Sequence, residues 1–314
     1  MRPKSMENPN ANPLLCDLET GLCQLPSSAA LEPAPAAMVR PKPVKVIYYT
    51  DPICSTCWGI EPQLRKLKLD YGHDLEITYR MGGLLPDWSY NSGGISKPAD
   101  VARHWDEVSQ YYDMPIDGDV WLEDPLPSSY PPSIAFKAAQ LQSQEKALQF
   151  LRIIREMVFL HRKNITRPEH LSTAARAAGL DVDRLKTDME GEARTLFSQD
   201  LELGRKLGVR GFPTLFFADD SGRQEIVYGY RPYEAYVSAL LRLHDSVRRV
   251  FDTHWTNLFA VYPSLTAREF SELSGVSRMA SERCLQELTE KGHLTRLQTK
   301  NGSLWTASLR GNPA

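Results

Sequence analysis

The pattern of apolar and polar positions divides the chain into three segments. Residues 1 to about 43 mix prolines with alanine, serine and asparagine and show little apolar periodicity. Such a segment buries too little apolar surface to offset the loss of chain entropy, so we expect 1–43 to be a disordered tail. Apolar residues then recur with strand and helix periods over 44–250, and a second, shorter pattern occupies 251–314. The sequence therefore predicts a tail followed by two domains.

The segment 44–250 begins and ends with strands and carries helices between them. β-branched and aromatic runs predict strands at 44–49 and 75–81, and the runs 214–218 and 225–228 flank a turn and so predict a hairpin. Helical spacing predicts the helices 54–69, 134–141, 147–160, 171–178, 185–207 and 232–247. A βαβ half and a ββα half with a helical insertion at about 96–207 favour a mixed sheet with helices on both faces.

The segment 251–314 has the outline of a winged helix. Its predicted elements are helices at 253–261, 266–273 and 279–290, then a hairpin of strands at 294–298 and 304–306. The segment carries seven basic and six acidic residues, and the helix that would read DNA contains Glu282, Glu287 and Glu290. A groove-reading helix concentrates positive charge, so we favour a protein-interaction module over a DNA-binding one.

The composition is that of a globular protein without a membrane span. The 314 residues are 42% hydrophobic and 24% charged, and 37 basic against 39 acidic residues leave a net charge of −2. This balance argues against a chain that coats nucleic acid or an anionic membrane. No apolar run approaches the roughly 18 residues of a membrane helix. The first residues lack the apolar stretch of a secretory signal, so we expect a cytoplasmic protein.

Five cysteines, an odd and small number, do not suggest a disulfide framework. Two of them form the motif Cys54-Ser-Thr-Cys57 between the first predicted strand and the helix that follows. A cysteine at the start of a helix faces unpaired N–H groups and the positive end of the helix dipole, which favour its thiolate. The second cysteine lies one turn away, close enough to resolve a mixed disulfide. Spacing alone would equally fit half of a zinc site.

Two prolines favour the redox interpretation. Pro62 would kink the helix after the motif, and Pro213 opens the strand 214–218, where it withholds a backbone donor. This order of elements resembles the thioredoxin fold, in which a cis proline at this place faces the cysteines and the residue before it offers backbone to a peptide. The resemblance implies substrate contacts from Phe212, Thr214 and Trp58, although tryptophans near a sheet are more often part of the core.

The helical insertion resembles that of the DsbA-like branch of the fold. That resemblance implies a thiol-disulfide oxidoreductase in which Cys54 is the exposed nucleophile and Cys57 the resolving thiol. Cys54 would attack a substrate disulfide, and Cys57 would displace the reduced product from the mixed disulfide. Ser55 and Thr56 bring neither charge nor histidine between the cysteines. We therefore expect a milder redox couple than that of the strongly oxidising DsbA proteins.

Four segments resemble the YjbH-type adaptors, also called SpxH. They are TDPICSTCWG at 50–59, GDVWLEDP at 118–125, SIAFKAA at 133–139 and FLHRKNI at 159–165. Proteins of that family present the transcription regulator Spx to the cytoplasmic protease ClpXP. The resemblance therefore implies an adaptor whose thioredoxin-like fold is a binding module. The intact cysteine pair and Gly-Phe-Pro-Thr at 211–214 keep the oxidoreductase as the alternative.

The remaining cysteines have several interpretations. Cys16 and Cys23 are either accidental in a tail, a second redox pair, or metal ligands. The adaptor family associates an N-terminal cysteine and histidine with zinc, but 1–43 contains no histidine, and six intervening residues exceed the usual spacing. Cys284 lies mid-helix among leucines and is expected to be a core residue. No metal site is predicted at the histidines without a partner at ligand spacing, which are His104, His161 and His254.

Overall fold

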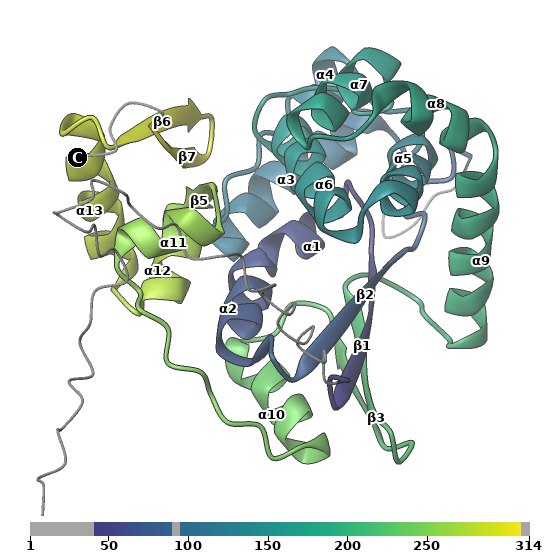
Figure 1. Ribbon diagram of the computed structural model, residues 1–314. Helices are drawn as coiled ribbons and strands as arrows, with labels where there is room; N and C mark the ends of the chain where they lie inside the picture. The colour runs from purple at the N-terminus through teal and green to yellow at the C-terminus, as the bar shows by residue number, and fades with distance from the viewer. Residues whose placement is uncertain (1–40, 90–94, 309–314) are drawn as a thin grey trace, which may run out of the picture. The chain divides into compact units, whose positions relative to one another are not determined.

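A computed structural model describes residues 41–89 and 95–308 (Figure 1). From Lys42 onward the chain forms one compact unit. The predicted tail lies almost entirely outside the described residues, and Cys16 and Cys23 lie outside them with it. Within the described residues, no helix is long and apolar enough to cross a membrane.

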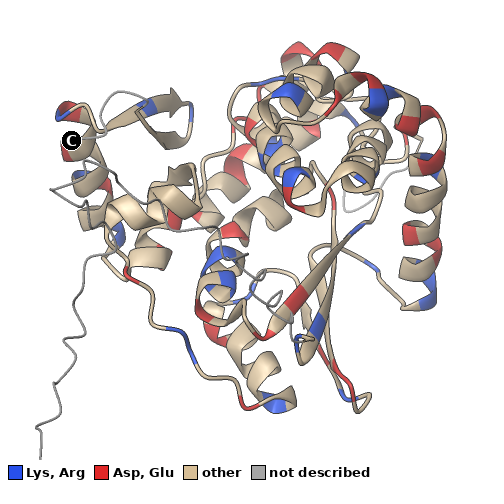
Figure 2. Ribbon diagram, in the orientation of Figure 1, with Lys and Arg blue, Asp and Glu red and all other residues tan. Residues whose placement is uncertain are grey.

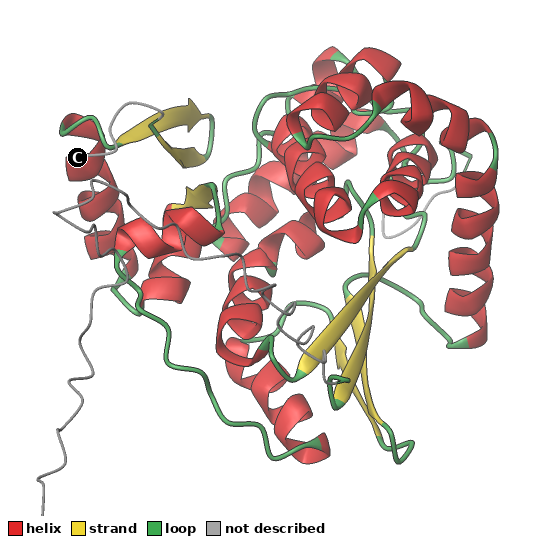
Figure 3. Cartoon of the chain, in the orientation of Figure 1, coloured by secondary structure: helices red, strands yellow, loops and turns green. Residues whose placement is uncertain are grey.

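A four-stranded mixed sheet is the centre of the first folded segment (Figure 3). Its strands are β1 (Val44–Thr50), β2 (Leu75–Met81), β3 (Thr214–Asp219) and β4 (Gln224–Tyr228), in the order β2-β1-β3-β4. β1 is parallel to β2 and antiparallel to β3, and β3 and β4 form a hairpin. The four predicted strands are confirmed with ends within one residue, because their β-branched and aromatic runs are bounded by turn residues.

Helices cover both faces of this sheet. α2 (Glu61–Tyr71) and α10 (Tyr233–Leu243) pack together on one face, and α9 (Glu192–Lys206) lies along the other (Figure 1). Successive side chains of a strand point to opposite faces, and β1 follows this rule. Tyr48 packs edge-on against Tyr79, whereas the Tyr49 hydroxyl donates to the carbonyl oxygen of Asp200 in α9 at 3.1 Å.

The insertion between β2 and β3 is helical, as the sequence predicts. Its helices before α9 are α3 (Pro98–Tyr112), α4 (Val120–Glu123), α5 (Tyr130–Gln142), α6 (Gln144–Phe159), α7 (Pro168–Ala177) and α8 (Val182–Glu190). Phe136, Phe150 and Ile154 of α5 and α6 are fully buried. Phe159 of α6 stacks on Trp58 at a centroid distance of 5.4 Å, so the insertion packs directly against the cysteine motif.

Three observed helices differ from the predicted ones. The helix predicted at 54–69 is two helices, α1 (Ser55–Gly59) and α2, because Pro62 belongs in the first turn of a helix, where its missing N–H leaves no bond unmade. The helix predicted at 185–207 is interrupted at Gly191, whose backbone is not helical (φ −121°, ψ −110°). α10 ends at Leu243 rather than near 247, since the backbone of His244 is extended.

The C-terminal segment has a small core of its own. Its elements are α11 (Trp255–Val261), β5 (Ser264–Thr266), α12 (Ala267–Ser274), α13 (Arg278–Glu290), β6 (Leu294–Thr299) and β7 (Gly302–Ala307), and its sheet has the order β5-β7-β6. Leu258, Phe270, Leu285 and Trp305 are buried in this core. The sequence prediction lacked β5, because a strand of three residues is too short to show an alternating pattern.

Candidate functional site

The two cysteines of the motif lie between the end of β1 and the start of β3. Cys54 is the N-cap of α1, and the Cys57 N–H donates to Cys54 Sγ at 3.2 Å. The Cys54 thiol donates to the carbonyl oxygen of Phe212 at 3.7 Å, and the Phe212–Pro213 peptide bond is cis. Both cysteines are free thiols. The pairing of β1 with β3 thus brings the dithiol and the proline loop together across 158 positions of the chain.

Both thiols are buried. Cys54 is 4% exposed and Cys57 has no exposed surface, so the prediction that Cys54 is an exposed nucleophile is wrong for this conformation. The end of α3 packs over the motif, because the Tyr112 hydroxyl lies 2.9 Å from the Thr56 hydroxyl. The Phe212 carbonyl contacts the motif from the loop before β3, through its hydrogen bond with Cys54.

A buried guanidinium lies beside the dithiol. The side chain of Arg155, on α6, is 1% exposed and pairs with the Glu61 carboxylate at 2.6 Å. It also donates to the Thr50 hydroxyl at 2.5 Å and to the carbonyl oxygen of Asp51 at 3.3 Å. The insertion therefore places a positive charge at the end of β1, next to the turn that leads to the cysteines.

The acidity of the two thiols differs because of their surroundings. Burial acts to raise the pKa of Cys57, but its hydrogen bond with Cys54, the charge of Arg155 and the Thr50 side chain outweigh burial and lower that pKa. The pKa of Cys54 is raised, first by burial and then by the neighbouring Cys57. The prediction placed the thiolate at Cys54 because of a helix dipole. In the structure α1 has only five residues, and the nearby charge of Arg155 lowers the pKa of Cys57.

Asp51 is a second buried ionisable group at the site. Its carboxylate accepts hydrogen bonds from the Ile53 N–H at 3.0 Å, the Leu84 N–H at 2.8 Å and the Ser129 hydroxyl at 2.8 Å. Burial raises the pKa of Asp51 to about 6, although these hydrogen bonds oppose the shift. The carboxylate ties the turn before Cys54 to the loop after β2 and to the start of α5.

The residues predicted to contact a substrate have different surroundings. Phe212 is half-buried, with its ring against Gly82, and it borders a cavity of about 410 Å³. Thr214 is buried and its hydroxyl donates to the Gly211 carbonyl oxygen at 2.7 Å. Trp58 has no exposed surface, and its Nε1 donates to the carbonyl oxygen of Pro115 at 3.1 Å. The predicted substrate contact of Trp58 is therefore corrected to core packing.

Sequence reasoning missed four residues of the site, which are Asp51, Glu61, Tyr112 and Arg155. The signal for Arg155 was present, since it follows Ile154 on the apolar face of a predicted helix. Arginine is rarely buried without a partner, so that position indicates a buried ion pair. Nothing in the pattern around Tyr112 indicates that its hydroxyl meets Thr56, because the two belong to elements joined only in the folded chain.

The described part of the chain holds no group of three or more histidine, cysteine, aspartate or glutamate side chains placed to bind a metal ion. The zinc and redox interpretations of Cys16 and Cys23 concern residues outside it. Cys284 is half-buried on α13 and packs against the C-terminal core, and burial is the main cause that raises its pKa.

Comparisons with known proteins identify the family to which this chain belongs. The thioredoxin family model matches residues 48–238. The ClpXP adapter protein SpxH of Halalkalibacterium halodurans is 33% identical over 298 residues, which cover 92% of this chain and 96% of that protein. The chain belongs to the SpxH family of ClpXP adapter proteins. The SpxH of Bacillus subtilis is 28% identical and covers 84% of this chain and 89% of its own length.

A solved structure agrees with the fold. The cytosolic disulfide reductase DsbM from Pseudomonas aeruginosa matches with a TM-score of 0.53 and 23% identity, over 64% of this chain and all of that one. The predicted family and the predicted DsbA-like thioredoxin fold are thereby confirmed. The SpxH relatives match a larger share of the chain than DsbM does, so the family likeness is not limited to the thioredoxin fold.

Proposed function

We propose that this chain is a cytoplasmic adaptor that binds the transcription regulator Spx and promotes its degradation by ClpXP. The observation that carries the proposal is the extent of the family match. Relatives named ClpXP adapter protein SpxH align over 92% of the chain, and a stretch of that length must include residues on both sides of the thioredoxin fold. Because an enzyme of this fold needs no C-terminal segment for its thiol chemistry, the likeness outside the fold favours the adaptor.

The buried dithiol supports a binding role for the thioredoxin segment. A thiol-exchange enzyme must bring its nucleophilic sulfur into contact with a substrate disulfide. Cys54 and Cys57 have almost no exposed surface, so little of either residue is open to a substrate in this structure. An adaptor needs only the outer surface of the same scaffold.

We propose that the C-terminal segment is a winged helix used for protein contacts. Its order α11-β5-α12-α13-β6-β7, with β6 and β7 as the wing, supports this assignment. Lys300 at the tip of the wing pairs with Asp106 at 2.6 Å and with Asp119 at 2.7 Å. The charge of Lys300, which a winged helix could present to a phosphate backbone, is thus already paired with two carboxylates of the first folded segment.

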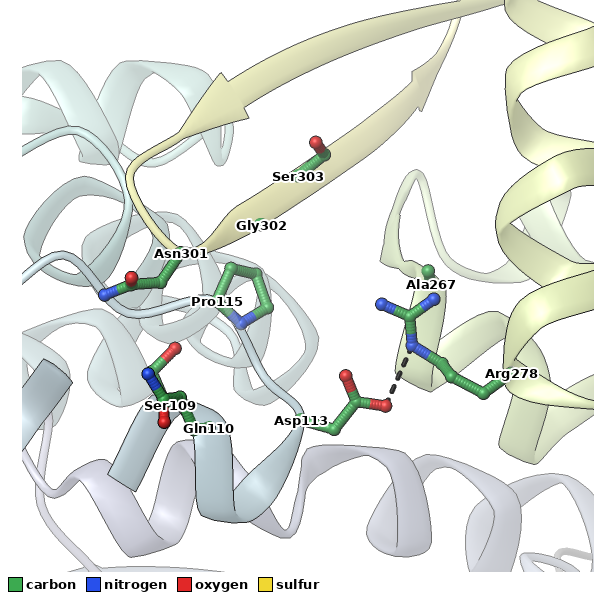
Figure 4. A pocket seen from close by; sticks show the side chains of 9 residues that line it. All are labelled: Ser109, Gln110, Asp113, Pro115, Ala267, Arg278, Asn301, Gly302 and Ser303. Carbon is green, nitrogen blue, oxygen red and sulfur yellow. Dashed lines mark ion pairs between the residues drawn. The ribbon is translucent and has the colours of Figure 1, made fainter. Parts of the chain in front are cut away.

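The basic residue at the start of α13 is also paired with an acidic residue of the first folded segment (Figure 4). Arg278 forms an ion pair with Asp113 at 2.8 Å, across a cavity of about 200 Å³ that the wing residues Asn301 and Gly302 also line. Basic and acidic residues are interspersed along the helices in Figure 2. These pairings favour a protein partner over nucleic acid.

Degradation of Spx by purified ClpXP tests the adaptor proposal. We expect the full chain to shorten the half-life of Spx several-fold and to leave an unrelated ClpXP substrate unaffected. A variant with both Cys54→Ser and Cys57→Ser should retain this effect, because the thiols are buried. An unchanged Spx half-life at saturating concentrations of the chain would refute the proposal.

Thiol-disulfide exchange is the second candidate, favoured by one observation. The Cys54 thiol faces the carbonyl oxygen before a cis proline, where a substrate backbone would also lie. Reduction of a disulfide peptide, with dithiothreitol as the source of electrons, measures this activity. The dithiol would become a disulfide as the peptide disulfide becomes two thiols, and dithiothreitol would restore it. Turnover that Cys54→Ser abolishes, together with a failure of both the wild-type chain and the variant to promote Spx degradation, would favour the enzyme.

A further inference from the structure

A network of buried charges connects the dithiol to the C-terminal segment. Its first link is the pair between Arg155 and Glu61 described above. Glu61 also lies 3.7 Å from Arg65 one turn later in α2. Arg65 in turn pairs with Glu269 of α12 at 3.2 Å. The chain of ion pairs thus runs from the end of β1, beside the cysteine motif, into the C-terminal segment.

The carboxylate of Glu269 is buried and has several ion-pair and hydrogen-bond partners. Its carboxylate has no exposed surface and forms a two-point ion pair with Arg152 of α6, with nitrogen–oxygen distances of 2.8 and 3.1 Å. It also accepts from the Thr266 N–H at 2.8 Å, which completes the capping box at the start of α12. Burial acts to raise the pKa of Glu269, but the charges of Arg152 and Arg65 outweigh it and lower that pKa.

Arg152 also contacts the residue after the second cysteine. Its guanidinium lies over the ring of Trp58 at 4.4 Å from the centroid, and its Nε donates to Glu156 at 2.6 Å. The network therefore contains three arginines and three glutamates with no net charge, which are Arg65, Arg152, Arg155, Glu61, Glu156 and Glu269.

We infer that Glu269 is a positioning residue for the Cys54–Cys57 thiols, and that the C-terminal segment thereby sets their acidity. Its carboxylate neutralises Arg152 and Arg65 and leaves Glu61 to hold Arg155 beside the dithiol. In a dry interior such charges act over several residues, because little solvent screens them. The inference concerns ionisation of the thiols and holds whether or not the chain acts on Spx.

Other titratable groups also face the thiols and set the background against which Glu269 acts. They are Tyr48 and Asp51 at the end of β1, Tyr112 at the end of α3, Arg155 on α6 and Tyr236 on α10. None of these side chains belongs to the C-terminal segment. The described contacts link Glu269 to the thiols through the arginines of the network.

Two substitutions that change the net charge of the network in opposite directions test the inference. Glu269→Gln leaves one positive charge uncompensated, so the lower thiol pKa of the pair should fall by about half a unit or more. Arg65→Gln leaves one negative charge uncompensated and should raise it by a similar amount. The measurement is the ultraviolet absorbance of thiolate against pH, in the full chain with Cys16, Cys23 and Cys284 replaced by serine. A change in packing alone would not shift the thiol pKa in opposite directions in the two variants.

Glu272 provides the matched control. It lies one turn after Glu269 on α12 and pairs with Lys66 at 3.4 Å and with Arg268 at 3.0 Å, outside the network. Glu272→Gln should leave the thiol pKa unchanged. Shifts of the same sign in the Glu269 and Arg65 variants, or no shift in either, would overturn the inference.

A measurement on the unsubstituted chain covers the case in which Glu269→Gln does not fold. Coupling between two sites is reciprocal, so oxidising the dithiol to a disulfide with oxidised dithiothreitol, which takes up its two protons and two electrons, must alter the stability of α12. We expect amide exchange in α12 to differ between the reduced and oxidised chain. Identical exchange in the two states would also overturn the inference.

Discussion

The ring of Tyr112 packs so closely against Gly59 that a β-carbon at position 59 would lie 2.5 Å from it. Gly59 is the last residue of α1, and Tyr112 is the last residue of α3. The turn that carries both cysteines is thus pressed against the insertion at a position where only glycine fits. This contact holds the end of α3 against the helix that contains Cys57.

We predict that Gly59→Ala destabilises the protein by about 1–3 kcal/mol, although alanine is the better helix former. The reason is the overlap with the Tyr112 ring, which must move. In a Tyr112→Ala background the same substitution should instead be neutral or stabilising by up to about 1 kcal/mol. Urea unfolding of the four proteins measures both effects. Equal effects of Gly59→Ala in the two backgrounds would contradict the packing argument.

We predict that Arg155→Met lowers the free energy of unfolding by about 3 kcal/mol, because it removes one partner of a buried ion pair. It should also raise the pKa of Cys57, since the charge that favours the thiolate is lost. Urea unfolding and a thiolate titration measure the two effects. Arg242→Met is the control, because the Arg242 side chain that pairs with Glu225 is 60% exposed, and it should change neither quantity appreciably.

We predict that stability depends on pH through Asp51. Its pKa is raised to about 6 in the folded protein, above the value of about 3.9 expected in the unfolded chain. A carboxyl with a raised pKa contributes stability below the unfolded pKa, and that contribution is lost as pH rises through about 6. The wild type should therefore lose on the order of 2–3 kcal/mol relative to Asp51→Asn between about pH 4 and 7. Parallel pH profiles of unfolding free energy would disprove this assignment.

We predict that Lys300→Met loosens the contact of the wing with the first folded segment. The substitution leaves Asp106 and Asp119 facing each other without the cation between them, so stability should fall by about 1 kcal/mol at low salt. The loss should shrink in high salt, where the repulsion is screened. Lys45→Met, which breaks a single exposed pair with Asp220, should have a smaller effect. A salt-independent loss would mean that packing, rather than charge, holds the wing.

The strands and the dithiol motif were predictable because their information is local. A run such as Val44–Thr50 has one strongly preferred backbone state, and the cysteine spacing is visible in the sequence itself. Pro62 also indicated a disturbed helix, and the helix is indeed divided there. The role of Pro213 was accessible only because its distance from Cys54 in sequence matched a known arrangement of elements.

The environment of the thiols was not predictable, because it depends on residues from four separate elements. Arg155 approaches from α6, Glu61 from α2 and Tyr112 from α3, while the Phe212 carbonyl comes from the loop before β3. Burial then decides how strongly each acts, since a charge in a dry interior is screened far less than one in water. Sequence spacing carries neither quantity.

The sequence by itself determined the family, the strands and the position of the dithiol, since these depend on local pattern and on motif order. Only the tertiary structure decided that the thiols are buried and that Cys57 has the lowered pKa. It also decided that Glu269, 215 positions after Cys54, belongs to the charge network beside them. The physical reason is that electrostatic energy depends on distance and burial in space, which the order of residues along the chain does not contain.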